Sequence, residues 1–381
     1  MEPRTLGNGE PLTLEELEDR ARARLPADVW DFVQGGSGAE WTLAANREQF
    51  GRYVLRPRVL VDVSVVDSSV ELLGARLAAP IGVAPMAYHQ LACEDGEVAT
   101  AAAAGEAGAL FVVSIFASRT LEEIAAAASG PLWLQLYWLR RREFLAELAG
   151  RAEAAGYRAL VLTVDAPKVA RRLRDVRNSF ALPSGVRAVN LEPAATAAAH
   201  QRGDGVSGIE AHSREQFDQS IGWADLAWLR ARTRLPLVLK GVLTAEDAAL
   251  AVEHGVDALV VSNHGGRQLD GAVPALAALP EILAAVPAGY PVLLDGGVRR
   301  GTDVAKALAL GARAVLVGRP VFWGLAAGGR AGAAATLNLL RSELEEAMVL
   351  SGRPSLAQLD RSAVGHWPER DPHPSEGVVR W

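Results

Sequence analysis

Cysteine is nearly absent from this chain of 381 residues, in which Cys93 is the only one. A single thiol cannot form an internal disulfide or a multi-cysteine zinc site, and such cysteine usage is typical of the reducing cytosol. Cys93 is also a poor candidate for a nucleophile, because a lone thiol is more often a small core residue. We therefore expect a cytoplasmic protein.

Long apolar runs are missing as well. The N-terminal segment MEPRTLGNGEPLTLEELEDR carries charges where a signal peptide needs its apolar core. The longest apolar stretch, residues 99–117, contains Glu106 and is too short and too polar to span a bilayer. We expect no association with a membrane.

Neither an excess of basic residues nor a common nucleotide-binding motif is present. The 39 basic and 45 acidic residues give a net charge of −6, and no long basic run occurs, which argues against nucleic acid as a partner. No GxGxxG follows a first strand and no GxxxxGK[ST] occurs, so a Rossmann nicotinamide site and a P-loop are disfavoured. No tight group of His, Asp and Glu indicates a metal. The substrate is expected to be a small molecule.

Eight short apolar runs alternate with alanine-rich amphipathic segments. The runs are IGVAPM (81–86), ALFVVS (109–114), LWLQLY (132–137), ALVLTVD (159–165), LPLVLKG (235–241), ALVVSN (258–263), PVLLDGG (291–297) and AVLVGRP (314–320). Strands that are apolar throughout are covered on both faces, so the pattern predicts an α/β fold of the TIM-type (β/α)8 barrel class. An open, doubly wound sheet is the alternative.

The remaining segments frame this barrel, and we treat residues 1–381 as one domain. Residues 1–75 are expected to form an N-terminal helical extension, in which the capping box Thr13-x-x-Glu16 begins a helix to about Leu25 and a second helix covers 27–33. The barrel is assigned to 76–350. The tail, 352–381, is rich in Pro, Arg and Asp and is expected to wrap a surface or to be partly disordered.

The fourth connection is unusually long. About 45 residues, 178–222, separate the fourth run from its helix, and they include AATAAAHQRGDGVSG at 194–208. Loops of this length in a compact domain are usually active-site lids or disordered, and a mobile lid combines both. We predict a loop-4 lid over 178–222.

Polar side chains gather where the apolar runs end. In a barrel the carboxyl ends of all strands meet on one face, where such folds keep their chemistry. One such side chain alone could be structural, but a structural role for all of them is improbable. They are Ser114, Gln135, Tyr137, Thr163, Asp165, Lys240, Ser262, His264, Asp295, Gly318 and Arg319.

The segment SNHGGRQLDG, residues 262–271, is the most informative of these ends. His264 can accept a proton near neutral pH, and Arg267 presents a permanent fork of donors that suits a carboxylate. Gly265 and Gly266 allow the backbone to approach a ligand closely. A solvated loop with a structural histidine is the alternative for such a segment in isolation.

Two glycine-containing loops predict a phosphate site. Asp295-Gly296-Gly297-Val298-Arg299 and Gly318-Arg319 follow the seventh and eighth runs, where barrels commonly bind phosphate through backbone N–H groups. Helix capping with surface arginines is the alternative. A phosphate site without the nucleotide motifs indicates a phosphorylated cofactor such as FMN, or a phosphorylated substrate.

Taken together, these motifs resemble the FMN-dependent 2-hydroxy acid oxidase and dehydrogenase family, which includes glycolate oxidase, lactate oxidase and mandelate dehydrogenase. The resemblance extends over nearly the whole chain. It is carried by LPADVWDF (25–32), WTLAANREQF (41–50), LQLY (134–137), LTVDAP (162–167), LKGVLTAEDA (239–248), SNHGGRQLDG (262–271) and LLDGGVRRGTDVAKALALGARAVLVGRP (293–320). It implies FMN at the carboxyl face of the barrel and a homotetramer or octamer.

The resemblance also implies roles for individual residues. His264 corresponds to the base at the α-carbon or hydroxyl of the substrate, Asp165 to its hydrogen-bonded carboxylate, and Tyr137 to the hydroxyl at the 2-oxygen. Arg172 and Arg267 correspond to a clamp for the substrate carboxylate, and Lys240 to the cation at the flavin N1/O2 edge. The positions that correspond to flavin-lining and phosphate-binding residues are Ala84, Pro85, Met86, Ala87, Ser114, Gln135, Thr163, Ser262, Asp295, Gly296, Gly297, Arg299, Gly318 and Arg319.

One position departs from the family pattern. Many members have a tyrosine that contacts the substrate carboxylate in a segment like VYDYY, whereas this chain has VWDFV with Phe32 at that position. The pocket loses a donor and gains apolar surface. In this region the chain resembles the 4-hydroxymandelate oxidases, which implies an aryl substrate. Trp30, Trp133 and Trp138 are candidates for an aryl pocket, with core packing as the alternative.

The expected function is therefore FMN-dependent oxidation of an (S)-2-hydroxy acid to the 2-oxo acid, with oxygen as the acceptor. Mandelate or 4-hydroxymandelate is the preferred substrate. Lactate or glycolate is the alternative substrate, and a flavin-free barrel isomerase or lyase acting on a phosphorylated metabolite is the alternative enzyme. A non-catalytic binding protein is a third possibility.

Overall fold

Eight parallel strands form a closed barrel. The computed structural model describes residues 11–191, 197–200 and 207–367, and the strand order in the barrel is β10-β11-β4-β5-β6-β7-β8-β9. The TIM-type barrel expected from the sequence is confirmed, and the open sheet is excluded. The strands are β4 (Ile81–Val83), β5 (Leu110–Ser114), β6 (Leu132–Tyr137), β7 (Leu160–Thr163), β8 (Leu237–Val242), β9 (Ala258–Val261), β10 (Val292–Asp295) and β11 (Ala314–Val317).

Each strand lies within one of the apolar runs or overlaps it closely. Several runs continue beyond their strand, as the first does after Val83, because the chain turns there into the loops above the barrel. In β8 the pairing with β9 shifts between Lys240 and Val242. Gly241 has φ +108°, and a Cβ atom there would lie 2.6 Å from the Cβ of Asp165, so only glycine lets the bulge pass this side chain.

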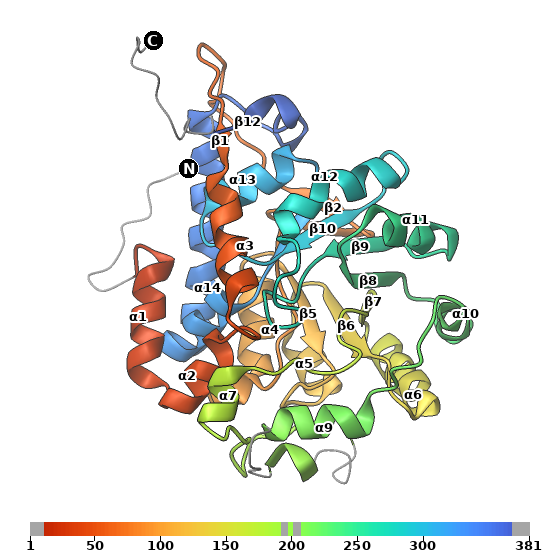
Figure 1. The fold of residues 1–381 in the computed structure, drawn as a ribbon. Helices are drawn as coiled ribbons and strands as arrows, with labels where there is room; N and C mark the ends of the chain where they lie inside the picture. Colours follow the sequence, from red (N-terminus) through yellow and green to blue (C-terminus); the bar gives the residue numbers. More distant parts are fainter. Residues whose placement is uncertain (1–10, 192–196, 201–206, 368–381) are drawn as a thin grey trace, which may run out of the picture.

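Helices surround the barrel (Figure 1). The apolar faces of most of these helices pack against the outer faces of the strands and form the larger core cluster. They are α4 (Glu97–Glu106), α5 (Leu121–Ala127), α6 (Arg142–Ala154), α7 (Leu173–Arg177), α9 (Gly208–Gln216), α10 (Asp225–Arg230), α11 (Ala245–Glu253), α12 (Ala275–Ala285), α13 (Gly301–Ala309) and α14 (Arg319–Leu350). Within the described parts of the chain, no helix combines the length and the apolar character that crossing a bilayer requires.

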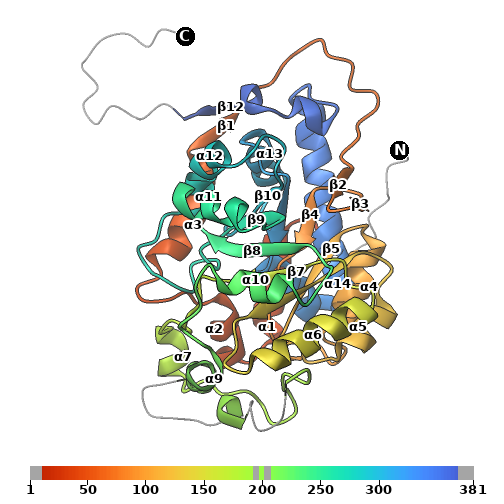
Figure 2. The same cartoon turned by 90° about the vertical axis from the view of Figure 1, so that its right-hand side faces the viewer.

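The segment before the barrel is not purely helical, which corrects the sequence prediction. Its helices are α1 (Leu14–Arg24), α2 (Ala27–Gln34) and α3 (Trp41–Gly51), and the first two match the expected helices. Strand β1 (Tyr53–Leu55) pairs with β12 (Val364–His366), so the described part of the C-terminal segment contains a strand (Figure 2). Residues 368–381 of the expected tail lie outside the described residues. A hairpin of β2 (Val70–Leu72) and β3 (Ala75–Leu77) contributes apolar side chains to the barrel-interior cluster.

The loop-4 segment contains ordered structure that the sequence did not predict. Helix α9 begins after Ser207, whose side chain accepts a hydrogen bond from the backbone N–H of Glu210. A short 3₁₀ helix covers Ala197–His200. Much of the low-complexity stretch at 194–208 lies outside the described residues. Helices α7 and α9 lie together at the lower end of the molecule in Figure 1, with α2 beside α7.

Candidate active site

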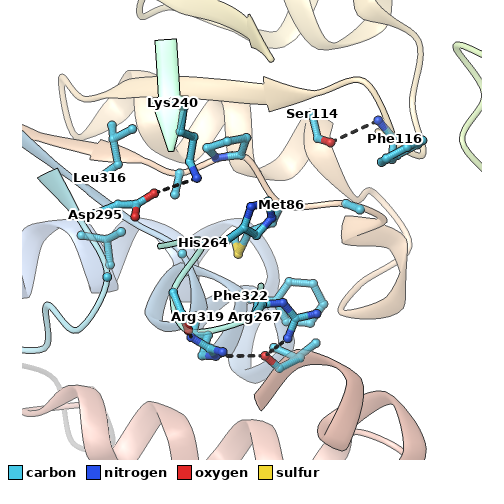
Figure 3. A pocket seen from close by; sticks show the side chains of 18 of the residues that line it. Met86, Ser114, Phe116, Lys240, His264, Arg267, Asp295, Leu316, Arg319 and Phe322 are labelled. Carbon is cyan, nitrogen blue, oxygen red and sulfur yellow. Dashed lines mark hydrogen bonds and ion pairs between the residues drawn. The ribbon is translucent and has the colours of Figure 1, made fainter. Parts of the chain in front are cut away.

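A pocket lies at the carboxyl ends of the barrel strands (Figure 3). Most of the residues proposed from the sequence line it. Those that do are Phe32, Ala84, Pro85, Met86, Ala87, Ser114, Tyr137, Arg172, Lys240, His264, Arg267, Asp295, Gly296, Gly297, Arg299, Gly318 and Arg319. The other four, Gln135, Asp165, Thr163 and Ser262, lie behind this lining and hydrogen-bond to it or to each other.

His264 and Asp165 form a pair at the centre of this face. The Nδ1 atom of His264 lies 2.9 Å from Oδ1 of Asp165. On the other side of the ring, Nε2 lies 3.4 Å from the hydroxyl oxygen of Tyr137. The carboxylate of Asp165 accepts a hydrogen bond from Nδ1, so the neutral imidazole carries its proton on Nδ1. Nε2 then has a lone pair that can accept a proton.

The backbone around His264 explains the glycines that follow it. His264 has φ +59°, and Gly265 and Gly266 are also left-handed. A Cβ atom at Gly266 would lie 2.6 Å from the backbone of Leu43 in α3, so only glycine fits. The N–H of His264 donates to the hydroxyl of Ser262 at 3.0 Å. This turn directs the imidazole over the barrel mouth at a conformational cost of about 1–2 kcal/mol.

The environment lowers the pKa of both members of the pair. Burial destabilises the imidazolium, and although Asp165 opposes this effect, the pKa of His264 lies below its ordinary value. Burial alone would raise the pKa of Asp165, but the charge and hydrogen bond of His264 and the charge of Lys240 outweigh it. At neutral pH the pair therefore consists of an aspartate and a neutral imidazole.

Two buried arginines lie beside this pair. Arg172 is 7% exposed, and its nearest carboxylate, Asp175, is 3.8 Å away. Arg267 donates to the backbone oxygen of Gly35 at 2.7 Å. Burial lowers the pKa of both guanidinium groups, and for Arg267 the neighbouring charges of Arg172 and Arg319 add to the effect. An anion bound between the two arginines would relieve this unfavourable concentration of charge.

Phe32 is brought into the pocket by α2. Its ring stacks on Phe180 with centroids 4.4 Å apart. The guanidinium carbons of Arg172 and Arg267 lie 6.0 and 5.4 Å from the centre of the Phe32 ring. The aromatic face thus contacts the cations without donating a hydrogen bond.

A second charged group lies deeper in the barrel. The ammonium of Lys240 lies 3.1 Å from Asp295 (Figure 3). It also donates to the Ser262 hydroxyl at 3.0 Å. On a neighbouring part of the rim, Gln135 links Ser114 and Thr163 through hydrogen bonds of 3.2 and 3.0 Å. These contacts place one buried cation and a row of donors and acceptors at the barrel mouth.

The loops after β10 and β11 carry two more buried cations. Arg299 lies over the ring of Trp323 at 4.9 Å, and its Nε has no partner among the described residues. Burial lowers the pKa of Arg299 to about 10 and that of Arg319 to about 9. The Arg319 side chain donates to Val33, Gly35 and Gly265 carbonyls, so it also holds α2 against the rim. An anion such as a phosphate fits this donor set.

Sequence reasoning missed the aromatic and aliphatic part of the pocket. Tyr88, Phe116, Val169, Ile209, Phe217 and Phe322 also line it. The sequence patterns around these residues are the same as those around ordinary core residues. Three tryptophans considered for an aryl pocket, Trp30, Trp133 and Trp138, do not line it; Trp133 fills the barrel interior, and Trp138 packs on Trp228. Among the described residues, no three His, Cys, Asp or Glu side chains are grouped to hold a metal ion.

Comparisons with known proteins agree with this geometry. The chain is 49% identical over 350 residues to 4-hydroxymandelate oxidase from Amycolatopsis orientalis, an alignment that covers 92% of this chain and 97% of that protein. It is 48% identical over 357 residues to L-lactate oxidase from a Nostoc species, with the same coverage. A crystal structure of mandelate oxidase with (S)-4-hydroxymandelic acid matches with a TM-score of 0.89 at 48% identity, covering 93% of this chain and 98% of that one.

The family match extends over most of the chain. The model that describes FMN-dependent dehydrogenases matches residues 21–366, which include every residue proposed for the site. FMN is thus the cofactor, and the flavin-free alternative has no support. By motif, by barrel topology and by this match, the chain belongs to the FMN-dependent dehydrogenase family.

Proposed function

We propose that the protein oxidises an (S)-2-hydroxy acid, preferably an aryl one such as mandelate or 4-hydroxymandelate, to the 2-oxo acid and passes the electrons to oxygen. The observation that carries this proposal is a base, His264, 2.9 Å from Asp165 and beside the two buried arginines Arg172 and Arg267. Such a site binds a carboxylate and removes a proton from the neighbouring carbon or its hydroxyl.

Arg172 and Arg267 bind the substrate carboxylate. Asp175 is the nearest carboxylate to Arg172, at 3.8 Å, and the substrate would supply a second anion to this pair of cations. A planar guanidinium can donate two parallel hydrogen bonds to a carboxylate. With the carboxylate held there, the α-carbon and its hydroxyl lie toward Nε2 of His264 and the Tyr137 hydroxyl. Tyr137 contacts the 2-oxygen.

His264 accepts a proton at Nε2, from the α-carbon or from the hydroxyl. Asp165 accepts the hydrogen bond from Nδ1 and stabilises the imidazolium that forms. FMN held at this rim would supply the two-electron acceptor for the substrate, with oxygen as the final acceptor. The overall reaction removes two electrons and two protons from the alcohol, so the product is the 2-oxo acid and oxygen becomes hydrogen peroxide.

The remaining site residues hold the cofactor. Lys240 would stabilise negative charge at the edge of the reduced ring, because it is a buried cation next to the barrel mouth. Arg299 and Arg319, with the backbone of Gly296, Gly297 and Gly318, would bind the phosphate. The ring system and ribityl chain would be lined by Ala84, Pro85, Met86, Ala87, Ser114, Gln135, Thr163, Ser262 and Asp295.

Phe32 and the aromatic lining support an aryl substrate. The pocket contains Tyr88, Phe116 and Phe217 in addition to Phe32, and aromatic side chains favour an aromatic substituent through stacking and edge contacts. The relatives leave a small aliphatic substrate as the second candidate, because the lactate oxidase is as similar to this chain as the hydroxymandelate oxidase.

An anaerobic flavin-reduction screen tests the proposal. The purified FMN protein is mixed with glycolate, lactate, mandelate and 4-hydroxymandelate, and bleaching of the flavin absorbance is followed. We expect the aryl acids to give the largest kcat/KM. Preference for the small acids would contradict the aryl assignment, and no reduction by any of the four would contradict the activity itself.

We also expect, from the family resemblance alone, a homotetramer or octamer. Light scattering during size-exclusion chromatography gives the mass of the assembly. A monomer would contradict this expectation without affecting the proposed reaction.

A further inference from the structure

Phe217 lies at the end of the loop-4 lid, but the backbone around it is fixed to the barrel. It directly follows Gln216, the last residue of α9. An antiparallel bridge pairs it with Leu139, two residues beyond Tyr137. The N–H of Asp218 donates to the oxygen of Trp138 at 3.0 Å, and the N–H of Arg140 donates to the oxygen of Gln216 at 3.0 Å. The position of Phe217 is therefore set by the end of β6.

The side chain of Phe217 completes a group of three aromatic rings that we call the aromatic wall. Its ring stacks on Tyr137 with centroids 4.7 Å apart and on Phe116 at 6.2 Å. Phe116 and Tyr137 are themselves 5.4 Å apart. All three residues line the pocket, and Phe217 is 2% exposed. The wall is thus a packed surface whose members restrict one another.

The wall lies next to the proposed base, and Tyr137 is the member of the wall that also interacts with the charges of Arg172 and Arg267. The ring centre of Tyr137 is 6.4 Å from that of His264, whereas Arg172 and Arg267 lie over Phe32. In Figure 3 Phe116 lies on the other side of the pocket from Asp295. A 2-hydroxy acid with its carboxylate on the arginines and its α-carbon at His264 therefore has the wall as one of the apolar surfaces that can contact its 2-substituent.

We propose that Phe217 determines the largest 2-substituent that the site accepts. This inference rests on the proposed function and adds a residue that limits substrate size. Phe116 is placed by the rim after β5, and Tyr137 is engaged with His264, so Phe217 is the member of the wall that can change without altering the proton-transfer group. A shorter side chain at 217 leaves space beside Tyr137, and a larger substituent can occupy it.

The test compares Phe217→Ala and Phe217→Leu with the parent. The measured quantity is the ratio of kcat/KM for a naphthyl-substituted glycolic acid to kcat/KM for lactate, from anaerobic flavin reduction. One methylene more or less in an apolar pocket changes the discrimination between two substrates by about 10- to 200-fold, and a phenyl group is larger than one methylene. We expect the ratio to rise by at least about tenfold in Phe217→Ala and by a smaller factor in Phe217→Leu.

Two further readouts separate a size limit from a structural role. The pH profile of flavin reduction should be unchanged, because His264 and Asp165 are not altered. Phe144→Ala is the matched control: Phe144 lies on α6, packs on the core and does not line the pocket, so its ratio should stay at the parent value. If Phe217→Ala loses FMN on purification, the milder Phe217→Leu decides by the same ratio.

A ratio that stays at the parent value in an FMN-containing Phe217 variant would overturn the inference, because Phe217 would then only anchor the lid. A parent protein whose flavin no 2-hydroxy acid reduces would instead overturn the proposed function. The parent measurement therefore distinguishes the two failures.

Discussion

At the scale of single residues, the chemistry depends on His264. Replacing it with alanine removes the group that accepts the proton and leaves the cofactor contacts in place. We expect His264→Ala to retain FMN and to reduce its flavin about 10²–10⁴-fold more slowly with substrate. Stopped-flow absorbance under anaerobic conditions measures this rate. Flavin reduction at the parent rate would show that another group is the base.

The pH dependence of the reaction follows from the same pair. His264 must be neutral to act as a base, and its pKa is lowered below 6.5 by burial. The kcat/KM profile should therefore stay flat as the pH falls to about 6.5 and decline only below it. Asp165 raises the pKa of His264, so Asp165→Asn should move this decline to still lower pH as well as slow the reaction. A decline that moves to higher pH in the variant would contradict the assignment.

The guanidinium of Arg267 offers a test of the carboxylate clamp. Lysine keeps the charge but lacks the planar fork, and it cannot also donate to the Gly35 carbonyl in the same geometry. Arg267→Lys should lower kcat/KM by more than about tenfold while FMN stays bound. An unchanged kcat/KM would leave the clamp to Arg172 alone.

At the scale of secondary-structure elements, substrate preference depends on how α2 packs against the barrel rim. Arg267 and Arg319 donate to carbonyls at the end of α2, and this contact places Phe32 beside both cations. Salt bridges from Arg174 to Asp31 and Glu40 join α2 and the segment after it to α7. A helix from outside the barrel therefore supplies part of the pocket.

Phe32→Tyr tests this arrangement. A tyrosine hydroxyl would donate to the substrate carboxylate, and a hydrogen bond to a charged group contributes about 1.5–3 kcal/mol when its geometry is good. The parent should prefer mandelate to glycolate or lactate, and Phe32→Tyr should narrow that preference. Steady-state kcat/KM for the three acids in both proteins gives the answer. If the parent and Phe32→Tyr had the same ratio of kcat/KM for mandelate to that for glycolate or lactate, the side chain of residue 32 would not reach the substrate.

At the scale of the whole molecule, the buried cations around the pocket link stability to the cofactor. A ligand that binds only the folded state stabilises it by about 2.7 kcal/mol at a free concentration 100 times its Kd. Arg299 lies over Trp323, and its Nε finds no partner in the part of the chain that the structure describes, so its charge is costly until an anion binds. FMN should therefore raise the Tm of the apoprotein.

Arg299→Met should separate these two effects. The variant loses a contact to the phosphate but also loses a buried charge, so its FMN-induced rise in Tm should shrink while the Tm of its apoprotein does not fall. Differential scanning calorimetry with and without FMN measures both. A large fall in the Tm of the apoprotein would show that Arg299 holds the fold together and not the cofactor.

The sequence by itself determined the alternation of apolar strands with helices and the polar half of the site, and the structure excluded the open sheet. Strands that are apolar on both faces have few stable arrangements, and the alternation with helices leaves the parallel barrel among them. Once the strands close, their carboxyl ends must meet, so residues as distant along the chain as Asp165 and His264 come within a hydrogen bond. Local sequence patterns were sufficient to predict these features, because all strands of a parallel barrel run in the same direction and their carboxyl ends lie on the same face.

Only the tertiary structure decided the apolar half of the site and the contacts between distant segments. The sequence around Phe116, Phe217 and Phe180 does not indicate a pocket residue. An aromatic side chain in a loop has the same local sequence pattern whether it contacts a substrate or the core. Two contacts join segments hundreds of residues apart. They are the pairing of β1 with β12 and the hydrogen bonds that Arg267 and Arg319 donate to carbonyls at the end of α2. Such contacts depend on the shapes of the packed surfaces, and these exist only after the chain has folded.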